Sequence, residues 1–323
     1  MARKRLPLNF STKPVDNVCK VSGVSAIDLH QHLWPEALFE ALSRRTAPPR
    51  LVRRGGDWML ELAGEAPSSV SPAAHSPARS AHAHDLIGIA PSSPLGIESL
   101  PAEEAQPLLD AFHDGVLELG GPFRLWAAPA LAAPGAGALE IDALLDRGAI
   151  GACVPASALA SEIRLVRLSA LLERLEARDA PLFVHPGPAT SRGPSWWPAM
   201  TSYVADMQAA WLAWAAWGRA QHPRLKVLFA MLAGGAPLHA ERLAARGGPA
   251  EAIHDELTFF DVSSYGPHTV DAMLRVVGVD RLVYGSDAPV IEPVSLEPLG
   301  DSVAHALTGA NPARLLALDV VAA

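Results

Sequence analysis

Two histidines near the start of the chain have the spacing of a metal site. His30 and His32 lie at the end of the apolar run Val24–His30, with one residue between them. Side chains alternate along a strand, so residues two apart point to the same side. Both imidazoles therefore aim at one point, and such nitrogen ligands suit Zn²⁺ and similar divalent cations. By itself, the pair is equally well explained as two polar residues in a loop.

Two more residues with metal-ligating side chains close apolar runs further along the chain. His185 ends Pro181–His185, and Asp287 comes just after Arg281–Gly285. A buried histidine needs partners for its ring nitrogens, so a purely packing role is a poor explanation at the end of an apolar strand. Four potential metal ligands at or near the ends of predicted strands are better explained by one shared site than by chance. The sequence thus predicts a single site built from His30, His32, His185 and Asp287.

The elements that must position these residues alternate along the chain as strands and helices. Continuous apolar runs are typical of strands that are buried on both faces. Their alternation with segments of helical periodicity predicts an α/β fold, a single TIM (β/α)8 barrel, whose active site lies at the C-terminal ends of the strands. The strands are expected at Val24–His30, Leu86–Pro91, Phe123–Ala128, Ile150–Pro155, Pro181–His185, Lys226–Met231, Thr258–Ser263 and Arg281–Gly285. The helices are expected at Leu38–Arg44, Ala102–Leu119, Leu139–Asp146, Leu165–Arg178, Tyr203–Gln221, Leu238–Arg246, Thr269–Val277 and Asp301–Ala317.

An open, doubly wound sheet is the alternative fold. It would place a glycine-rich turn after the first strand, and this chain has His-Gln-His-Leu-Trp-Pro there. Two long connections remain, a long excursion after strand 1 at Trp34–Asp85 and a lid after strand 5 at Gly187–Met200. The Gly64–Ser80 part of the excursion is expected to be weakly structured. Residues 1–23 are interpreted as an N-terminal extension and residues 24–323 as the barrel domain.

The composition excludes several classes of function. The 323 residues are 50% hydrophobic and carry a formal net charge of −8, so a nucleic-acid footprint of clustered basic residues is not expected. No apolar run is long enough to span a bilayer, and the N-terminus lacks the apolar stretch of a signal peptide. Cys19 and Cys153 lie far apart, as reduced thiols of a cytoplasmic protein would. The expected partner is a small-molecule substrate.

Three motifs in the chain resemble the amidohydrolase superfamily. They are Ile27–His32, Val184–Gly187 and Gly285–Pro289. The most similar branch contains aminocarboxymuconate-semialdehyde decarboxylase and related metal-dependent hydrolases. The resemblance runs from about Ala26 to the end of the chain, with supporting marks at Pro223–Val227, Asp261–Ser264 and Asn311–Leu316.

The resemblance implies one divalent metal ion, commonly zinc, with manganese or iron as alternatives. The implied ligands are His30, His32, His185 and Asp287, and Asp287 would also be the general base. The chemistry is consistent, because a metal lowers the pKa of bound water to roughly 7 and a nearby carboxylate accepts the released proton. Asp28 is expected to support the ligands from behind.

One position departs from the family pattern. The family usually has a further histidine at the end of strand six, and Met231 stands there in this chain. A thioether neither shuttles protons nor donates a hydrogen bond. His239 is the nearest histidine in sequence, and a surface or capping role is the better interpretation of it.

Three functions follow from these residues. The first is a metal-dependent hydrolase, in which water activated at the metal attacks an ester, lactone or amide and Asp287 acts as general base. The alternative is non-oxidative decarboxylation of an unsaturated or aromatic carboxylic acid, which the absence of the strand-six histidine disfavours. The third is a catalytically degenerate barrel that retains a ligand or metal site.

Further residues are candidates for contact with the substrate. Trp34 follows the histidine pair and is a candidate wall of the pocket, although packing over the barrel mouth explains it equally well. Met231 and His268, which follows strand seven, are the other candidates. Arginines in the two long connections are candidates for gripping a carboxylate, although each is more often a solvated charge. They are Arg45, Arg50 and Arg192.

The remaining histidines and a tryptophan stripe have simpler interpretations. His75, His82 and His84 are expected in a solvated loop, and surface positions are expected for His113, His222, His254 and His305. Trp211, Trp214 and Trp217 recur every three residues of one helix. Packing against the barrel is the preferred explanation of this stripe, and a homodimer interface is the alternative.

Overall fold

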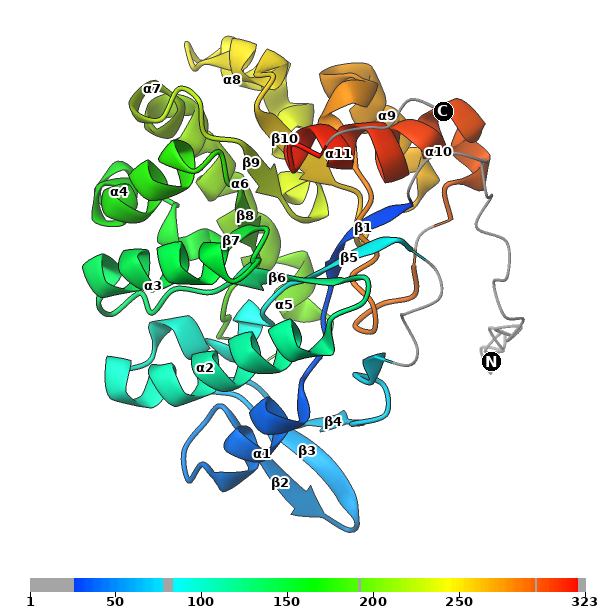
Figure 1. Ribbon diagram of the computed structural model, residues 1–323. Coiled ribbons are helices and arrows are strands. Elements are labelled where there is room, and N and C mark those ends of the chain that lie inside the picture. Colours follow the sequence, from blue (N-terminus) through cyan, green and yellow to red (C-terminus); the bar gives the residue numbers. More distant parts are fainter. Residues whose placement is uncertain (1–25, 78–83, 191–192, 294, 319–323) are drawn as a thin grey trace, which may run out of the picture.

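Eight short apolar segments form parallel strands that follow one another around a barrel (Figure 1). The computed structural model describes residues 26–77, 84–190, 193–293 and 295–318. A bridge between Gln31 and Ala288 joins the segment after the last strand to the first strand. The predicted TIM-barrel fold is therefore confirmed. The barrel strands are β1 (Ile27–Gln31), β5 (Leu86–Ile89), β6 (Phe123–Ala127), β7 (Gly151–Pro155), β8 (Leu182–His185), β9 (Val227–Phe229), β10 (Thr258–Asp261) and β11 (Leu282–Val283).

All eight predicted strands are present, each one to three residues shorter than expected. Every residue of β1, β7, β8, β9 and β10 is buried, as expected for strands covered by helices outside and by side chains inside the barrel. Figure 1 shows α2, α3 and α4 along the outer side of the sheet. The C-terminal strand ends are thereby held in a fixed arrangement around the barrel mouth.

The helices follow the predicted alternation with strands. The predicted helix Tyr203–Gln221 is α6, a π-helical turn at Trp214–Gly218, and α7. Trp211 and Trp214 are buried, as the packing interpretation requires, whereas Trp217 is 40% exposed. The helices are α1 (Glu36–Arg44), α2 (Ala102–Leu119), α3 (Pro134–Asp146), α4 (Glu162–Ala177), α5 (Trp197–Met200), α6 (Ser202–Ala213), α7 (Arg219–Gln221), α8 (Ala240–Ala244), α9 (Pro267–Val277), α10 (Asp301–His305) and α11 (Asn311–Leu315).

The excursion after β1 has more structure than the sequence analysis predicted. It contains an antiparallel sheet of β2 (Arg50–Arg54), β3 (Asp57–Glu61) and β4 (Ser68–Val70), which lies near α1 (Figure 1). Gly55 and Gly56 both have positive φ and make the tight turn between β2 and β3. The expectation of weak structure over Gly64–Ser80 was wrong for β4.

Three histidines that were expected at the surface or in a solvated loop are buried. His75, within the excursion, stacks on Trp34, His113 lies on the buried face of α2, and His222 stacks on Trp214. Burial lowers the pKa of His113 to about 4, and its Nε2 accepts the backbone N–H of Ala128. These predictions were wrong because a neutral imidazole with a backbone or aromatic partner is readily accommodated inside a protein.

The predicted N-terminal extension and Cys19 lie outside the described residues, while Cys153 is buried as a free thiol. Within the described ranges, none of the helices combines the length and apolar character needed to cross a bilayer.

Candidate metal centre

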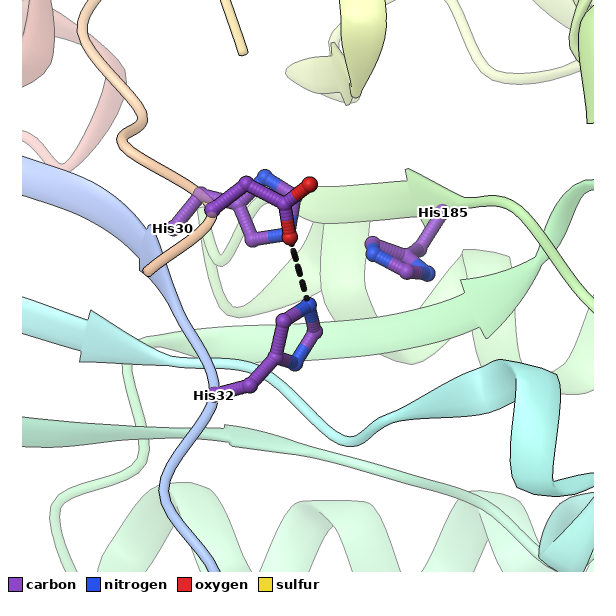
Figure 2. Close-up of side chains that lie close together, drawn as sticks. His30, His32 and His185 are labelled. Carbon is purple, nitrogen blue, oxygen red and sulfur yellow. Dashed lines mark hydrogen bonds and ion pairs between the residues drawn. The ribbon is translucent and has the colours of Figure 1, made fainter. Parts of the chain in front are cut away.

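The four residues singled out by the sequence meet at one end of the barrel. One ligand atom from each of His30, His32, His185 and Asp287 lies within 4.8 Å of the other three. Figure 2 shows the three histidine rings pointing toward one another from β1, the residue after it, and β8. Asp287 comes from the loop after β11 and lies beside His32, with 3.2 Å between Oδ1 and Nε2.

The hydrogen bonds of the three rings fix which nitrogen of each faces the others. Nδ1 of His30 is 2.8 Å from Oδ2 of Asp261, and Nδ1 of His32 is 3.1 Å from the carbonyl of Ala90. Nδ1 of His185 is 2.8 Å from the carbonyl of Pro186. A carboxylate or a carbonyl only accepts, so each Nδ1 carries the proton. The Nε2 lone pairs are left to face the centre of the group.

This arrangement of acceptors fits a divalent cation. Nε2 of His30 lies 3.0 Å from Nε2 of His32 and 3.6 Å from Oδ1 of Asp287. Two ligands at about 2.1 Å from a metal are about 3.0–3.4 Å apart when they subtend 90° to 109°. Lone pairs and a carboxylate that face one another so closely repel unless positive charge lies between them. The three nitrogens and one oxygen therefore match the donors that zinc, manganese and iron accept.

The loop after β11 aims the Asp287 carboxylate into the group. Asp287 has a positive φ of 58°, and its N–H donates to the carbonyl of His30 at 2.8 Å. Oδ1 faces the histidines, whereas Oδ2 lies 3.4 Å from the Ser264 hydroxyl. Burial raises the pKa of Asp287, but the 3.2 Å contact with Nε2 of His32 and the electrostatic influence of His30, His32 and His185 outweigh it and hold the pKa at about 2. The carboxylate is therefore ionised near neutrality.

Asp261, at the end of β10, ties His30 to the neighbouring strand. Its Oδ2 accepts from His30, and its Oδ1 accepts the N–H of Met231 at 2.9 Å and the hydroxyl of Ser263 at 2.5 Å. Gly285 leaves room for this contact, because a Cβ there would lie 3.0 Å from Oδ2 of Asp261. The sequence analysis did not give Asp261 a role at the site. The available signal was a carboxylate closing an apolar strand, the same signal that identified Asp287.

Asp28 holds β1 against the loop that carries Asp287. Its Oδ1 accepts the backbone N–H groups of His30 and Ser286, and its Oδ2 accepts from the side chain of Gln31. It is fully buried and lies behind the ligand group. This supporting position agrees with the expectation from the sequence.

Replacing Asp261 by Asn is expected to weaken metal binding about 10- to 100-fold, because partners that orient a metal-bound histidine typically contribute that much. The amide keeps the size of the side chain but loses the negative charge that holds His30. Competition with a chromophoric chelator measures the dissociation constant. Asp271→Asn is the matched control, since Asp271 pairs with Arg275 on the exposed side of α9. Equal metal affinity in both variants would refute this role of Asp261.

Metal uptake is expected to weaken as the pH falls. Burial lowers the pKa of His30, but Asp261, Asp287 and Asp28 outweigh it and raise the pKa above 6.5. Below that raised pKa, a proton occupies the Nε2 lone pair that the metal needs. Affinity should therefore be greatest above the pKa of His30 and fall about tenfold per pH unit below it, for one displaced proton. Titration of Mn²⁺ between pH 5.5 and 8.5 tests this, and an affinity independent of pH would contradict it.

Segments from the two long connections cover the ligand group. His75 stacks on Trp34 with 4.4 Å between ring centroids, and its Nδ1 lies 3.3 Å from the carbonyl of His32. Trp34 in turn donates to the hydroxyl of Ser92 at 2.9 Å. The excursion meets the segment after β8 where a Cβ on Gly64 would lie 3.0 Å from the Thr190 side chain. Asp287 itself is only 9% exposed.

The other predicted site residues fall in different places. Met231 is buried two residues after the end of β9, whereas His268 and His239 are exposed and lie outside the ligand group. Arg45 is held by the carbonyl of Pro49 and the carboxylate of Glu104, and Arg50 pairs with Glu61. Both arginines therefore stabilise the excursion. Arg192 lies outside the described residues.

Comparison with solved structures shows the same fold over most of the chain. IDCase from Metarhizium anisopliae is 18% identical, with 91% of this chain and 97% of that chain covered and a TM-score of 0.74. 5-Carboxyvanillate decarboxylase from Sphingomonas paucimobilis is 15% identical, with 92% of this chain and 100% of that chain covered and a TM-score of 0.69. 2,6-Dihydroxybenzoate decarboxylase from Rhizobium is 16% identical, with 91% of this chain and 99% of that chain covered and a TM-score of 0.64. At these identities the likeness establishes the fold.

Comparison of the sequence with known families is more specific. No curated protein matches this chain significantly. The sequence model of the family described as amidohydrolase matches residues 27–318, which include all four members of the ligand group. The resemblance found in the sequence motifs is thereby confirmed, and the chain belongs to the amidohydrolase family.

Proposed function

We propose that this chain is a metal-dependent decarboxylase of an aromatic or unsaturated carboxylic acid. The observation that carries the proposal is the ligand group, in which three Nε2 atoms and Oδ1 of Asp287 converge while Oδ2 is left for a proton. Several solved structures of this fold are decarboxylases, one of them complexed with 2,6-dihydroxybenzoate. These likenesses favour decarboxylation over the hydrolysis that the sequence analysis preferred.

We propose a single divalent ion held by His30, His32, His185 and Asp287. Manganese is preferred here to the zinc of the sequence analysis, because manganese is bound in two decarboxylases of similar fold. When bound, the ion would hold an anionic oxygen of the substrate and stabilise the negative charge that develops as CO₂ leaves. The spacing of His30 and His32 on one strand directs both imidazoles to the same side, toward the proposed ion.

Asp287 is the proposed proton carrier. It is ionised near neutrality, so it first accepts the proton of a substrate hydroxyl. The bond between the ring carbon and the carboxylate then breaks, CO₂ departs, and the electron pair stays on the carbon. Asp287 returns its proton to that carbon, and the substrate oxygen takes a proton from solvent on release. The hydroxyl of Ser264 lies near Oδ2, the oxygen that would carry the proton.

We propose that Trp34 and Met231 provide the apolar surface against which the ring of the substrate lies. Trp34 follows the histidine pair and is fixed by Ser92 and His75, and Met231 closes the neighbouring strand end beside Asp261. Apolar walls with few placed polar groups are typical of sites for small molecules. His268 is exposed and is proposed only as a contact at the rim of the site.

Hydrolysis of an ester, lactone or amide is the second candidate function. Two observations favour it, namely the ionised Asp287, which suits a general base, and Met231, which removes a proton donor from the site. A catalytically degenerate barrel is the third candidate, and it predicts metal binding without turnover.

One assay separates the three candidates. Protein loaded with Mn²⁺ is incubated with 2,6-dihydroxybenzoate, 5-carboxyvanillate, p-nitrophenyl acetate and γ-butyrolactone, and metal-free protein is the control. The proposal expects metal-dependent release of CO₂ from an aromatic acid. Metal-dependent release of acid from the ester or the lactone, without CO₂, would favour hydrolysis instead. Bound metal with no turnover of any substrate would support the degenerate barrel.

A further inference from the structure

The chain makes an unusual left-handed turn directly after β9. Met231, Leu232, Ala233, Gly234 and Gly235 all have positive φ, between 42° and 74°. This conformation is unfavourable for residues other than glycine, so the turn needs contacts that hold it. The turn is held by the hydrogen bond from the Met231 N–H to Asp261 and by the Gln208 side chain, which donates to the carbonyl of Gly234 at 2.9 Å. It places Met231 at the mouth of the barrel, where a thioether provides no hydrogen-bond donor.

The first turn of α6 packs against this left-handed turn. A Cβ at Gly234 would lie 2.7 Å from the carbonyl oxygen of Val204, so only glycine allows the two segments to approach so closely. Tyr203 precedes Val204, so its backbone lies beside the turn that follows β9. It is partly buried and packs against the core.

The Tyr203 hydroxyl lies within electrostatic range of two carboxylates, those of Glu65 and Asp287. Burial, followed by the negative charges of Glu65 and Asp287, raises the pKa of Tyr203 above its ordinary value. The phenol therefore keeps its proton near neutrality and acts as a donor. Within the described part of the chain, this hydroxyl makes no hydrogen bond. Glu65 belongs to the turn of the excursion that meets the segment after β8 at Gly64 and Thr190.

We propose that Tyr203 is a substrate-binding residue that donates to an anionic oxygen of the substrate the hydrogen bond that Met231 cannot donate. The inference rests on the proposed function and deepens it. It identifies α6, which no sequence motif marks, as the element that replaces the missing polar group at the end of β9. It also requires the substrate to carry an oxygen that accepts a hydrogen bond on the side of the site that faces α6.

The test measures binding of 2-nitroresorcinol, an inhibitor bound in a decarboxylase of similar fold. Its visible absorption is titrated with Mn²⁺-loaded wild type, Tyr203→Phe and Tyr284→Phe. Removing a hydrogen bond to a charged group typically changes an equilibrium about 10- to 100-fold, so Tyr203→Phe is expected to raise the dissociation constant by that factor. The Michaelis constant for an acid that the enzyme decarboxylates should rise with it. Bound metal and thermal unfolding should stay as in wild type.

Tyr284→Phe is the matched control. Tyr284 is also buried with a raised pKa, but its ring stacks on His84. The next residue, Gly285, faces His30 and Asp261 inside the barrel, so the side chain of Tyr284 points outward. This variant is expected to bind the inhibitor as wild type does.

The possible outcomes separate the two claims. Equal binding by wild type and Tyr203→Phe would overturn the role of Tyr203 and leave the proposed function intact. If Mn²⁺-loaded wild type neither binds 2-nitroresorcinol nor releases CO₂ from an aromatic acid, the proposed function fails, and the role of Tyr203 fails with it. Weakened binding in Tyr203→Phe alone supports both.

Discussion

Replacing His185 by alanine is expected to remove the metal and the activity together. His185 is the only member of the ligand group on β8, and its Nδ1 is fixed by the Pro186 carbonyl so that Nε2 faces the other ligands. Burial and the neighbouring His30 and His32 hold the pKa of His185 well below 6.5, so it is a neutral ligand. Loss of a partner behind a metal ligand costs roughly 10- to 100-fold in affinity. Loss of the ligand itself should therefore cost on the order of 1,000-fold or more.

Elemental analysis and turnover of the purified variant test this expectation. We expect the metal content to fall from about one ion per chain to less than about 0.1 ion per chain, because the three remaining ligands bind the ion much more weakly. His239→Ala is the control, because His239 is exposed and lies outside the ligand group. The account would be wrong if the His185 variant kept its metal, or kept activity without it.

Replacing Asp287 by asparagine is expected to abolish turnover while leaving part of the metal affinity. The three histidine ligands remain, and the amide oxygen still reaches the position of Oδ1. The amide cannot carry a proton, however, and general acid–base catalysis commonly contributes about 10²- to 10⁴-fold. We therefore expect kcat to fall at least about 1,000-fold, whereas metal binding weakens less than in His185→Ala.

Single-turnover kinetics with metal held in excess separate the two effects. The matched control is Asp280→Asn, an exposed aspartate whose backbone carbonyl, not its side chain, accepts from Arg314. If Asp287→Asn loaded with metal turned over substrate at the wild-type rate, proton transfer would have to be assigned to another group.

The features that the sequence predicted well are local. Each barrel strand is a short apolar run, and His30, His185 and Asp287 stand at or just after the end of such a run. A strand end fixes both the position and the direction of its last side chain. Side chains at the ends of parallel strands therefore meet once the barrel closes. This explains why the four residues could be grouped without any distance information.

The features that were missed depend on contacts between distant residues. Asp261 contacts His30, 231 positions away in sequence, and the buried His75 stacks on Trp34, 41 positions away. Tyr203 gains its position from the packing of α6 on the left-handed turn, which no pattern in α6 reveals. The β2–β3 hairpin did have a local signal, because Gly55-Gly56 separates two runs of strand-forming residues. The serine- and alanine-rich surroundings obscured it.

The most direct test of the central claim is a crystal structure of the protein grown with Mn²⁺, with data collected to locate the metal by its anomalous scattering. The account predicts one strong peak within about 2.0–2.3 Å of the three Nε2 atoms and Oδ1 of Asp287, a range that spans the usual lengths of such bonds. The Nδ1 atoms of the histidines should keep their contacts with Asp261, Ala90 and Pro186. A peak elsewhere, or no peak from protein shown to be saturated with Mn²⁺, would contradict it.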